Sequence, residues 1–189
     1  MLKESLHYSQ LNMANTRHKF STRNKVSRVI WLGTYFLLFR PFGLRVFKKW
    51  RIFLLRIFGG DISYKSMVNS SVKIWAPWNL TMGDFSCLGP NVDCYNQGHI
   101  TIENNVTISQ KAYLCSSSHD YSKATHDLLL KPILIKERAW VGADAFIGPG
   151  VTVGGGAIVG ARSAVFKNVD DWTVVGGNPA KFIKTRIID

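Results

Sequence analysis

His119 is the residue whose type and surroundings best suit catalysis. It lies in the run Ser116-Ser117-Ser118-His119-Asp120-Tyr121. Histidine has an ordinary pKa of about 6.5, so near neutral pH much of it is a neutral base that can take a proton from a hydroxyl group. Asp120, its neighbour, and Asp93, further upstream, are two carboxylates, either of which could orient the imidazole. The alternative interpretation is a solvated loop histidine without a chemical role.

The residues downstream of this run repeat with a period of six. A small residue or valine takes the fourth place after each aliphatic, and a glycine directly follows most of them. This period is neither helical nor a simple strand alternation. It fits a short strand followed by a tight corner, with three such faces per coil and a continuous core of stacked aliphatics. The pattern predicts an all-β fold, a parallel β-helix, from the aliphatic series Ile135, Val141, Ile147, Val153, Val159 and Val165.

The same phase continues upstream with interruptions. Ser86 occupies a place where an aliphatic residue is expected, and one interval stretches to eight through Asn96-Gln97-Gly98-His99. The phase is then lost between Ala112 and Ile135, so we expect an extended loop at about residues 115–132. Because the backbone of a regular coil is occupied with its neighbours, interruptions are where chemistry can be sited. The upstream series is Val68, Ile74, Leu80 and Val92, then Ile100, Val106 and Ala112.

Positive charge is concentrated in the first third of the chain. Residues 1–60 hold twelve Lys and Arg and one acidic residue, Glu4. The remaining residues hold twelve Lys and Arg and eleven Asp and Glu, so nearly all of the formal net charge of +12 lies in the first sixty residues. The excess belongs to one segment and not to the whole domain, so we expect no nucleic-acid partner. The three cysteines form no CxxC pair, which predicts neither a disulfide framework nor a zinc knuckle and fits a reducing cytoplasm.

Three regions follow from these patterns. We expect a loosely ordered tail over residues 1–24, a basic amphipathic helical segment over 25–60, and a β-helix domain over 61–189 with a short C-terminal tail. The apolar run 29–39 would be about 16 Å long as a helix, whereas a bilayer core needs about 30 Å, so it is too short to span. The helical segment either lies on an anionic membrane surface or caps the open end of the β-helix. The apolar residues of its second part recur at spacings of three and four, as on one face of an amphipathic helix: Leu44, Phe47, Trp50, Leu54, Ile57 and Phe58.

An ordered set of short motifs resembles the hexapeptide-repeat acyltransferases, and within them the colanic-acid-type exopolysaccharide biosynthesis acetyltransferases. The resemblance covers about residues 25–184. It implies that the β-helix is left-handed, an exception to the usual right-handed crossover, and that the protein is a homotrimer with active sites between neighbouring coils. The motifs are Ile108-Ser109-Gln110, Ala112-Tyr113-Leu114-Cys115, Ser118-His119-Asp120, Ala139-Trp140-Val141, Pro149-Gly150-Val151-Thr152-Val153 and Gly177-Asn178-Pro179-Ala180-Lys181.

This resemblance also implies a reaction. The chain would transfer an acetyl group from acetyl-CoA to the hydroxyl of a sugar or lipid-linked saccharide, in the cytoplasm or at the inner face of the membrane. His119 matches the catalytic histidine of the family. Phe166 stands where many relatives have Thr. The positions that match acetyl-CoA contacts are Trp140, Ala143, Ala161, Lys167 and Lys184.

Other readings stay open at this point. One alternative is an acetyltransferase with a different small acceptor, an antibiotic or serine, in place of a sugar. A zinc hydratase of the γ-carbonic-anhydrase type would use His99, His119 and His126, but their separations of twenty and seven do not fit that family's ligand pattern, so no metal is expected. A non-catalytic scaffold that binds membranes through its basic segment is the third reading.

Overall fold

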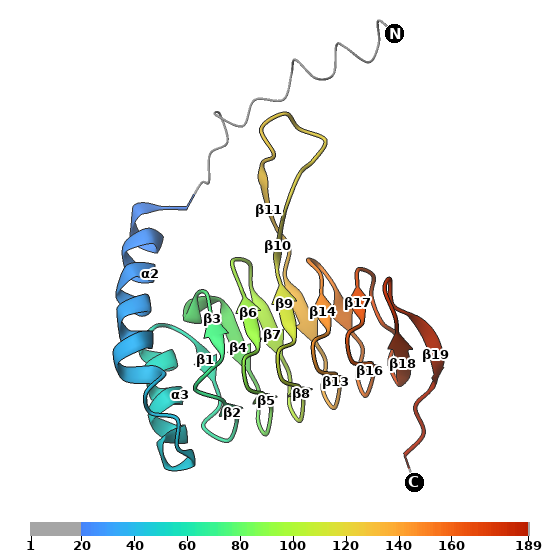
Figure 1. The fold of residues 1–189 in the computed structure, drawn as a ribbon, viewed down its shortest axis with the longest axis horizontal. Helices are drawn as coiled ribbons and strands as arrows, with labels where there is room; N and C mark the ends of the chain where they lie inside the picture. The colour runs from blue at the N-terminus through green and yellow to red at the C-terminus, as the bar shows by residue number, and fades with distance from the viewer. Residues whose placement is uncertain (1–19, 189) are drawn as a thin grey trace, which may run out of the picture.

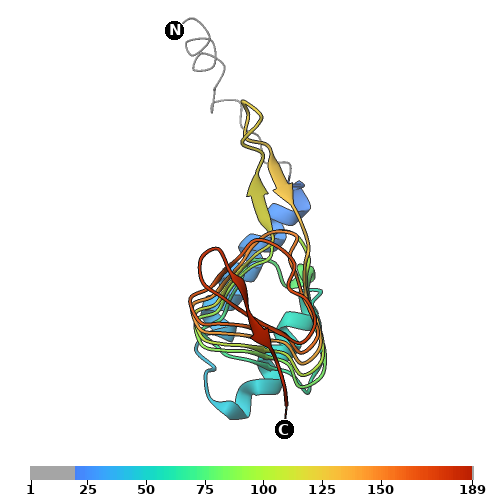
Figure 2. The same cartoon turned by 90° about the vertical axis from the view of Figure 1, so that its right-hand side faces the viewer.

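The computed structural model describes residues 20–188, which form a parallel β-helix of triangular cross-section with two helices against its first coil (Figures 1 and 2). The predicted all-β fold with an N-terminal helical segment is confirmed. Strands from successive coils pair in parallel on three faces, five each on faces A and C and six on face B, and the chain visits the faces in the order A, B, C. One hairpin leaves this regular stack near its middle (Figure 1).

Each face is a parallel sheet, and face B is extended at the C-terminal end by an antiparallel pair. Face A contains β1 (Asp61–Ile62), β4 (Leu80–Met82), β7 (Ile100–Ile102), β12 (Ile133–Ile135) and β15 (Thr152–Val153). Face B contains β2 (Met67–Val68), β5 (Cys87–Leu88), β8 (Thr107–Ile108), β13 (Trp140–Val141), β16 (Ile158–Val159), β18 (Thr173–Gly176) and β19 (Lys181–Thr185). Face C contains β3 (Lys73–Ile74), β6 (Asp93–Tyr95), β9 (Tyr113–Cys115), β14 (Phe146–Ile147) and β17 (Ala164–Val165).

The inner aliphatic row follows the predicted period after residue 135 but departs from it upstream. After Ile74 the next inward strand residue is Met82, an interval of eight, because a short 3₁₀ turn, η4 (Pro77–Asn79), enlarges the corner after face C. Leu80 and Ser86 therefore belong to the row of buried corner residues, and Leu88 is the aliphatic of its strand. The expectation that Ser86 replaces a core aliphatic was wrong for this reason.

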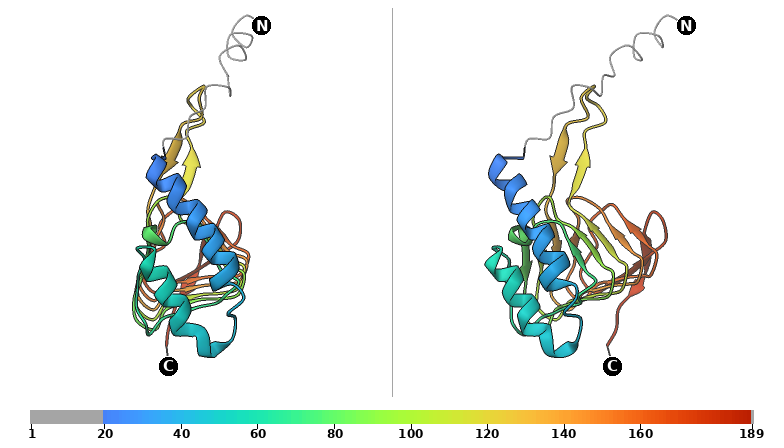
Figure 3. Two further views of the ribbon diagram at one scale, coloured as in Figure 1. Left: turned by 90° about the vertical axis from the view of Figure 1, so that its left-hand side faces the viewer. Right: turned by 60° about the vertical axis from the view of Figure 1, so that its left-hand side comes forward.

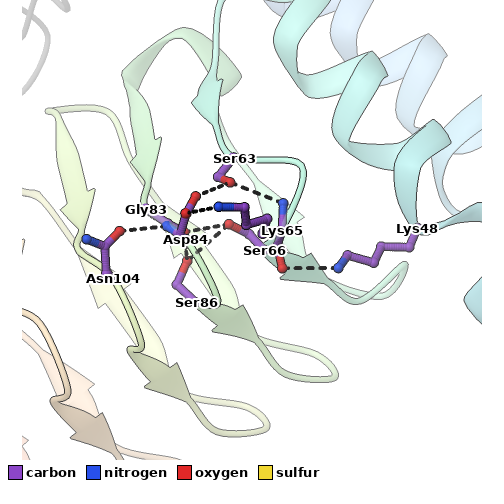
Figure 4. Close-up of polar contacts among 8 residues, drawn as sticks. All are labelled: Lys48, Ser63, Lys65, Ser66, Gly83, Asp84, Ser86 and Asn104. Carbon is purple, nitrogen blue, oxygen red and sulfur yellow. Dashed lines mark hydrogen bonds and ion pairs between the residues drawn. The ribbon is translucent and has the colours of Figure 1, made fainter.

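Ser86 has a different task at the corner between faces A and B. Its hydroxyl donates to the carbonyl of Gly83 at 2.8 Å, and the hydroxyl of Ser66 in the preceding coil donates to the same carbonyl at 2.6 Å (Figure 4). The backbone N–H of Asp84 donates to the side-chain oxygen of Asn104 in the following coil at 2.7 Å. Small polar side chains thus satisfy the backbone groups that the tight corner leaves without strand partners.

The first helix begins slightly earlier than expected and is anchored by aromatic residues. Ser21 caps α2 (Thr22–Thr34), so ordered helix starts before residue 25, and α2 continues into one turn of π-helix, η2 (Tyr35–Phe39). Trp31, Tyr35 and Phe39 recur every four residues and are buried. Residues 1–19 of the predicted tail lie outside the described part of the chain. No helix within residues 20–188 is long and apolar enough to cross a bilayer.

The second helix, α3 (Lys48–Ile57), follows the 3₁₀ turn η3 (Arg45–Phe47) and packs against β1, β2 and η4 (Figure 3). The predicted apolar stripe is only partly covered by the coils. Leu54 is buried, but Leu44 and Ile57 are 70% and 62% exposed. The helix starts at Lys48, so Leu44 precedes it, and the first coil covers Ile52 and Leu55 instead. These helices therefore cap the β-helix, while one side of each stays exposed.

Candidate active site

The predicted extended loop is a β-hairpin that projects from the corner between faces C and A. Its strands, β10 (Ser117–His119) and β11 (Leu128–Leu130), pair antiparallel, with His119 opposite Leu128. Figures 1 and 2 show the hairpin rising away from the coils at this one corner. The same corner is also enlarged in the two preceding coils, by η4 and by residues 96–99. Irregular backbone is thus stacked at one corner of three successive coils.

Buried polar side chains fix the base of the hairpin, and the sequence analysis did not identify them. Ser116 donates through its hydroxyl to the carbonyl of Gly98 at 2.9 Å and accepts from the N–H of Gly98 at 3.0 Å. The amide side chain of Asn96 makes the same two-way contact with the backbone of Ala76 one coil below. Both side chains are fully buried, so the hairpin grows from a corner whose polar groups are paired.

His119 is held in one orientation by a backbone carbonyl. Its Nδ1 lies 2.6 Å from the carbonyl oxygen of His126, which lies in the hairpin loop just before β11. A carbonyl oxygen can only accept, so this contact suits a ring that has a proton on Nδ1. His126 has a positive φ of 45°, which places its carbonyl in the turn facing the ring. His119 is exposed, and the contact fits the tautomer that a general base requires.

Asp120, one of the two predicted orienting carboxylates, shapes the turn of the hairpin. Its carboxylate accepts from the N–H and the hydroxyl of Ser122, at 3.1 and 2.5 Å. These two hydrogen bonds hold the pKa of Asp120 below its ordinary value. Its backbone N–H donates to the carbonyl of Asp127 at 2.8 Å, which closes the loop that carries His126. Asp120 therefore supports the partner of His119 through the loop conformation.

Asp93, the other predicted carboxylate, lies in a different environment on face C. Its carboxylate is 3.9 Å from the ammonium of Lys73, and burial raises its pKa although that lysine acts in the opposite direction. It lines a cavity between face C and α2, together with Tyr35 and Arg28. Its strand β6 lies next to β9, which leads directly into the hairpin.

Three of the predicted acetyl-CoA contacts lie on face B or at the corner after it. Trp140 is 47% exposed on β13, and its ring N–H donates to the hydroxyl of Ser109 at 2.8 Å. Ala143 and Ala161 occupy equivalent corners of successive coils, where the N–H of Arg162 donates to the carbonyl of Ala143 at 2.8 Å. The coils approach so closely here that a Cβ on Gly142 would lie 2.6 Å from the backbone nitrogen of Ala161.

The two predicted phosphate-binding lysines are separated. Lys167 is exposed at the corner after face C, whereas Lys184 lies on β19 opposite Val174. Lys167 lines a cavity of about 360 Å³ at the C-terminal end of the coils, together with Lys181 and Phe182. Lys181 was not predicted to contact acetyl-CoA. Its place in the motif Gly177-Asn178-Pro179-Ala180-Lys181 could have indicated it. Phe166, which stands in place of Thr, packs on Phe146 with ring centroids 5.6 Å apart.

The predicted residues do not all meet within one chain. His119 extends from the corner between faces C and A, while Trp140, Ala143 and Ala161 lie on face B and at the corner between faces B and C. In a triangular prism these are different corners, and the end-on view shows the hairpin leaving the coils at one corner (Figure 2). Within residues 20–188 of one chain, the two sets therefore lie on different parts of the prism.

The histidines do not gather around a common point. His99 Nε2 lies 3.0 Å from the hydroxyl oxygen of Thr81 on face A, while His119 and His126 belong to the hairpin. Across residues 20–188 there is no group of three His, Cys, Asp or Glu side chains placed to hold a metal ion. A catalytic zinc normally has three protein ligands, so nothing in this part of the chain favours the hydratase reading.

The chain is similar in sequence to named acetyltransferases. It is 41% identical over 168 residues to the "Putative colanic acid biosynthesis acetyltransferase WcaF" of Escherichia coli K12, with 89% of this chain and 92% of that protein covered. No family model matches the chain.

Solved structures give the same picture for the fold. The hexapeptide-repeat containing acetyltransferase VCA0836 of Vibrio cholerae, in complex with acetyl coenzyme A, has a TM-score of 0.78 and 26% identity, covering 93% of this chain and 97% of its own. A maltose O-acetyltransferase from Clostridium difficile 630 has a TM-score of 0.75 at 22% identity, covering 89% and 90% of the two chains. The second likeness concerns the fold alone.

Proposed function

The chain belongs to the hexapeptide-repeat acetyltransferases of the colanic-acid type, and on that premise we propose that it moves an acetyl group from acetyl-CoA to a sugar hydroxyl with His119 as general base. The observation that carries the proposal is the 2.6 Å contact between Nδ1 of His119 and the carbonyl oxygen of His126 on an exposed hairpin, which suits a neutral ring with Nε2 as its basic atom. Acetyl-CoA is the donor that the Vibrio cholerae structure contains.

The reaction follows from that tautomer. Nε2 of His119 takes the proton of the acceptor hydroxyl while the oxygen attacks the thioester carbonyl carbon. The tetrahedral intermediate then expels the CoA thiolate, so that a C–O bond forms and the C–S bond breaks. The imidazolium returns its proton to the sulfur, which yields free CoA and the acetyl ester. During the cycle the carbonyl of His126 stabilises the protonated ring and holds its plane.

The donor site in this proposal is shared between two copies of the chain. Trp140, Ala143 and Ala161 would line the pantetheine arm, and Lys167 and Lys184 would meet the phosphates, each as a cation for an anionic group. Trp140, Ala143 and Ala161 lie on face B or at the corner after it, whereas His119 lies on the hairpin at the corner between faces C and A. A homotrimer would bring the hairpin of one subunit to face B of the next. The cavity that contains Lys167 and Lys181 suits one end of the donor.

The N-terminal helices suit a contact with an anionic membrane surface. Val29 and Leu37 are 72% and 73% exposed on the side that faces away from the coils, and residues 20–60 contain no acidic residue. Basic amphipathic surfaces of this kind bind anionic lipid. We place the protein at the inner face of the membrane, on the cytoplasmic side, with a lipid-linked saccharide of exopolysaccharide biosynthesis as its acceptor.

The direct test is turnover of acetyl-CoA, followed by release of free thiol with a panel of sugars and lipid-linked sugars. We expect His119→Ala to lower kcat by about 10²- to 10⁴-fold, the usual cost of losing a general base. CoA affinity should be unchanged. Activity within a few-fold of wild type in this variant would refute the role of His119.

A matched control tests whether His126 acts through its backbone carbonyl or through its side chain. His126→Asn keeps the carbonyl that accepts from His119 and tolerates a positive φ. It should therefore keep wild-type turnover, although it removes a histidine from the same loop. Equal losses in both variants would mean that the two rings act together and that the carbonyl is not the orienting group.

A further inference from the structure

A cavity lies between α2 and the outer surface of face C in the first two coils, apart from the hairpin and from face B. Its volume is about 270 Å³. Its walls are mostly apolar and aromatic, including Trp75 and Tyr95, but Arg28, Arg40 and Lys73 also line it. The single carboxylate among the lining residues is Asp93, so the charged groups sum to +2. A positively charged cavity with apolar walls suits an anionic group attached to an apolar one.

Two residues that line this cavity, Tyr35 and Arg28, each have a buried donor atom with no partner among the residues that the structure describes. The hydroxyl of Tyr35 is buried, with the residue 6% exposed, and makes no hydrogen bond. The Nε N–H of Arg28 is likewise unpaired, while its guanidinium lies 3.6 Å from the centre of the Trp75 ring. Buried donors without acceptors are costly, so a site that keeps them is suited to a ligand that accepts hydrogen bonds. Burial also raises the pKa of Tyr35, so its O–H remains a donor at neutral pH.

The mouth of the cavity is apolar. Leu32 and Phe36 line it and are 54% and 53% exposed. They continue the exposed apolar side of α2 and η2 that includes Val29 and Leu37. A phosphate group inside the cavity would therefore leave its hydrocarbon chain on this apolar surface.

We propose that this cavity binds a phosphate group that joins an apolar chain to a saccharide, which makes it the docking site for the linking group of a lipid-linked acceptor. This inference rests on the proposed function for the identity of the saccharide, but the binding of the phosphate does not depend on it. Arg28 and Arg40 supply charge and fork-shaped donors, and Tyr35 supplies a neutral O–H.

The position of the cavity relative to His119 agrees with this role. Tyr95 in the cavity wall pairs in register with Cys115 on the next strand, and Cys115 leads into the hairpin within four residues of His119. Neighbouring strands are about 5 Å apart, and an extended chain advances about 3.3 Å per residue. A saccharide of a few units that starts in the cavity could therefore run along face C to the hairpin.

Three small probes separate the contributions to binding, measured by calorimetry on the full chain below their micelle concentrations. Octyl phosphate carries both groups, inorganic phosphate carries only the anion, and octyl glucoside carries only the chain and a sugar. We expect octyl phosphate to bind most tightly. Tyr35→Phe and Arg40→Gln should each weaken its binding by about tenfold, the value of one hydrogen bond to a charged group. Lys49→Gln, an exposed cation of α3 outside the cavity, should leave it unchanged.

Several outcomes would overturn the inference. Octyl phosphate binding that is no tighter than octyl glucoside binding, or that is equal in wild type and Tyr35→Phe, would exclude a phosphate site. Inorganic phosphate bound as tightly as octyl phosphate would exclude a lipid linkage. Tyr35→Phe keeps the ring in place and removes only an unpaired hydroxyl, so loss of fold should not confuse the result. His119→Ala should still bind octyl phosphate, so a failure of the proposed reaction would not be mistaken for a failure of the site.

Discussion

The coils and the hairpin place their side chains in opposite ways. In the coils, Ile102, Ile108 and Leu114 are completely buried, and each repeats the environment of the residue one coil away. In the hairpin His119 is exposed, Leu130 is 46% exposed, and the polar contacts run between residues a few positions apart. Stability and chemistry are therefore carried by different residues, and substitutions should separate the two.

The largest effect that this comparison predicts is on stability, from the core of the middle coil. Ile108→Ala removes a fully buried side chain from the stacked aliphatics. We expect the free energy of unfolding to fall by about 2–5 kcal/mol, since the cavity left behind cannot collapse between coils on both sides. Urea denaturation measures this, with Leu130→Ala in the hairpin as the matched control. A comparable loss in both variants would show that the hairpin is part of the cooperative core.

An intermediate effect should come from Arg51, which extends the comparison to the helical cap. Arg51 is 3% exposed and donates to the carbonyls of Val68, Phe42 and Leu44. Arg51→Met should cost about 1–3 kcal/mol, because it leaves buried carbonyls unpaired but also removes a desolvated cation. Burial lowers the pKa of Arg51, in agreement with that desolvation.

Thermal unfolding of Arg51→Met and of its control Lys49→Met measures the difference. Lys49 is exposed on the same helix, and surface changes usually stay within about 0.5 kcal/mol. Equal melting temperatures for Arg51→Met and wild type would mean that α3 is held by its apolar contacts alone.

The smallest effect should appear at Asp120 and be confined to the hairpin. Asp120→Ala removes the two hydrogen bonds from Ser122 and loosens the loop that carries the carbonyl of His126. We expect turnover to fall by roughly two- to tenfold, the scale of one or two exposed hydrogen bonds, with no change in the melting temperature. Asp120→Asn keeps an acceptor oxygen and should recover most of the activity. A fall of a thousandfold in both variants would instead make the carboxylate a direct participant.

The same carboxylate gives a pH dependence of known sign. The pKa of Asp120 is lower in the folded chain than its ordinary value, so its contribution to hairpin order is present at neutral pH and is lost as the pH falls through the folded value. The protection factors of the hairpin amides should therefore fall in acid before those of the coil amides do, and this difference should disappear in Asp120→Ala.

The period of six predicted the coils because each face of a coil buries one aliphatic strand residue. It assigned the wrong residues to the strands where a corner is longer than usual. At the enlarged corner between Ile74 and Met82, the period of six passes from the inward strand residues to the buried residues two places before them. Both sets are buried, so the hydrophobicity of the sequence could not reveal this shift. The amphipathic pattern of the second helix similarly showed that one side is buried but not where the helix begins. Leu44 and Ile57 fitted the period and lie in solvent.

The sequence by itself determined the β-helix, the break in it and the histidine at that break, because these depend on periodicity and on residue type. Only the tertiary structure decided what orients His119, since the partner is a backbone carbonyl that every residue carries and a turn places. It also decided that Arg51 is buried and that Asp93 faces a cavity under α2. Such contacts join segments far apart in the chain, and their geometry arises only when the helices have packed on the first coils.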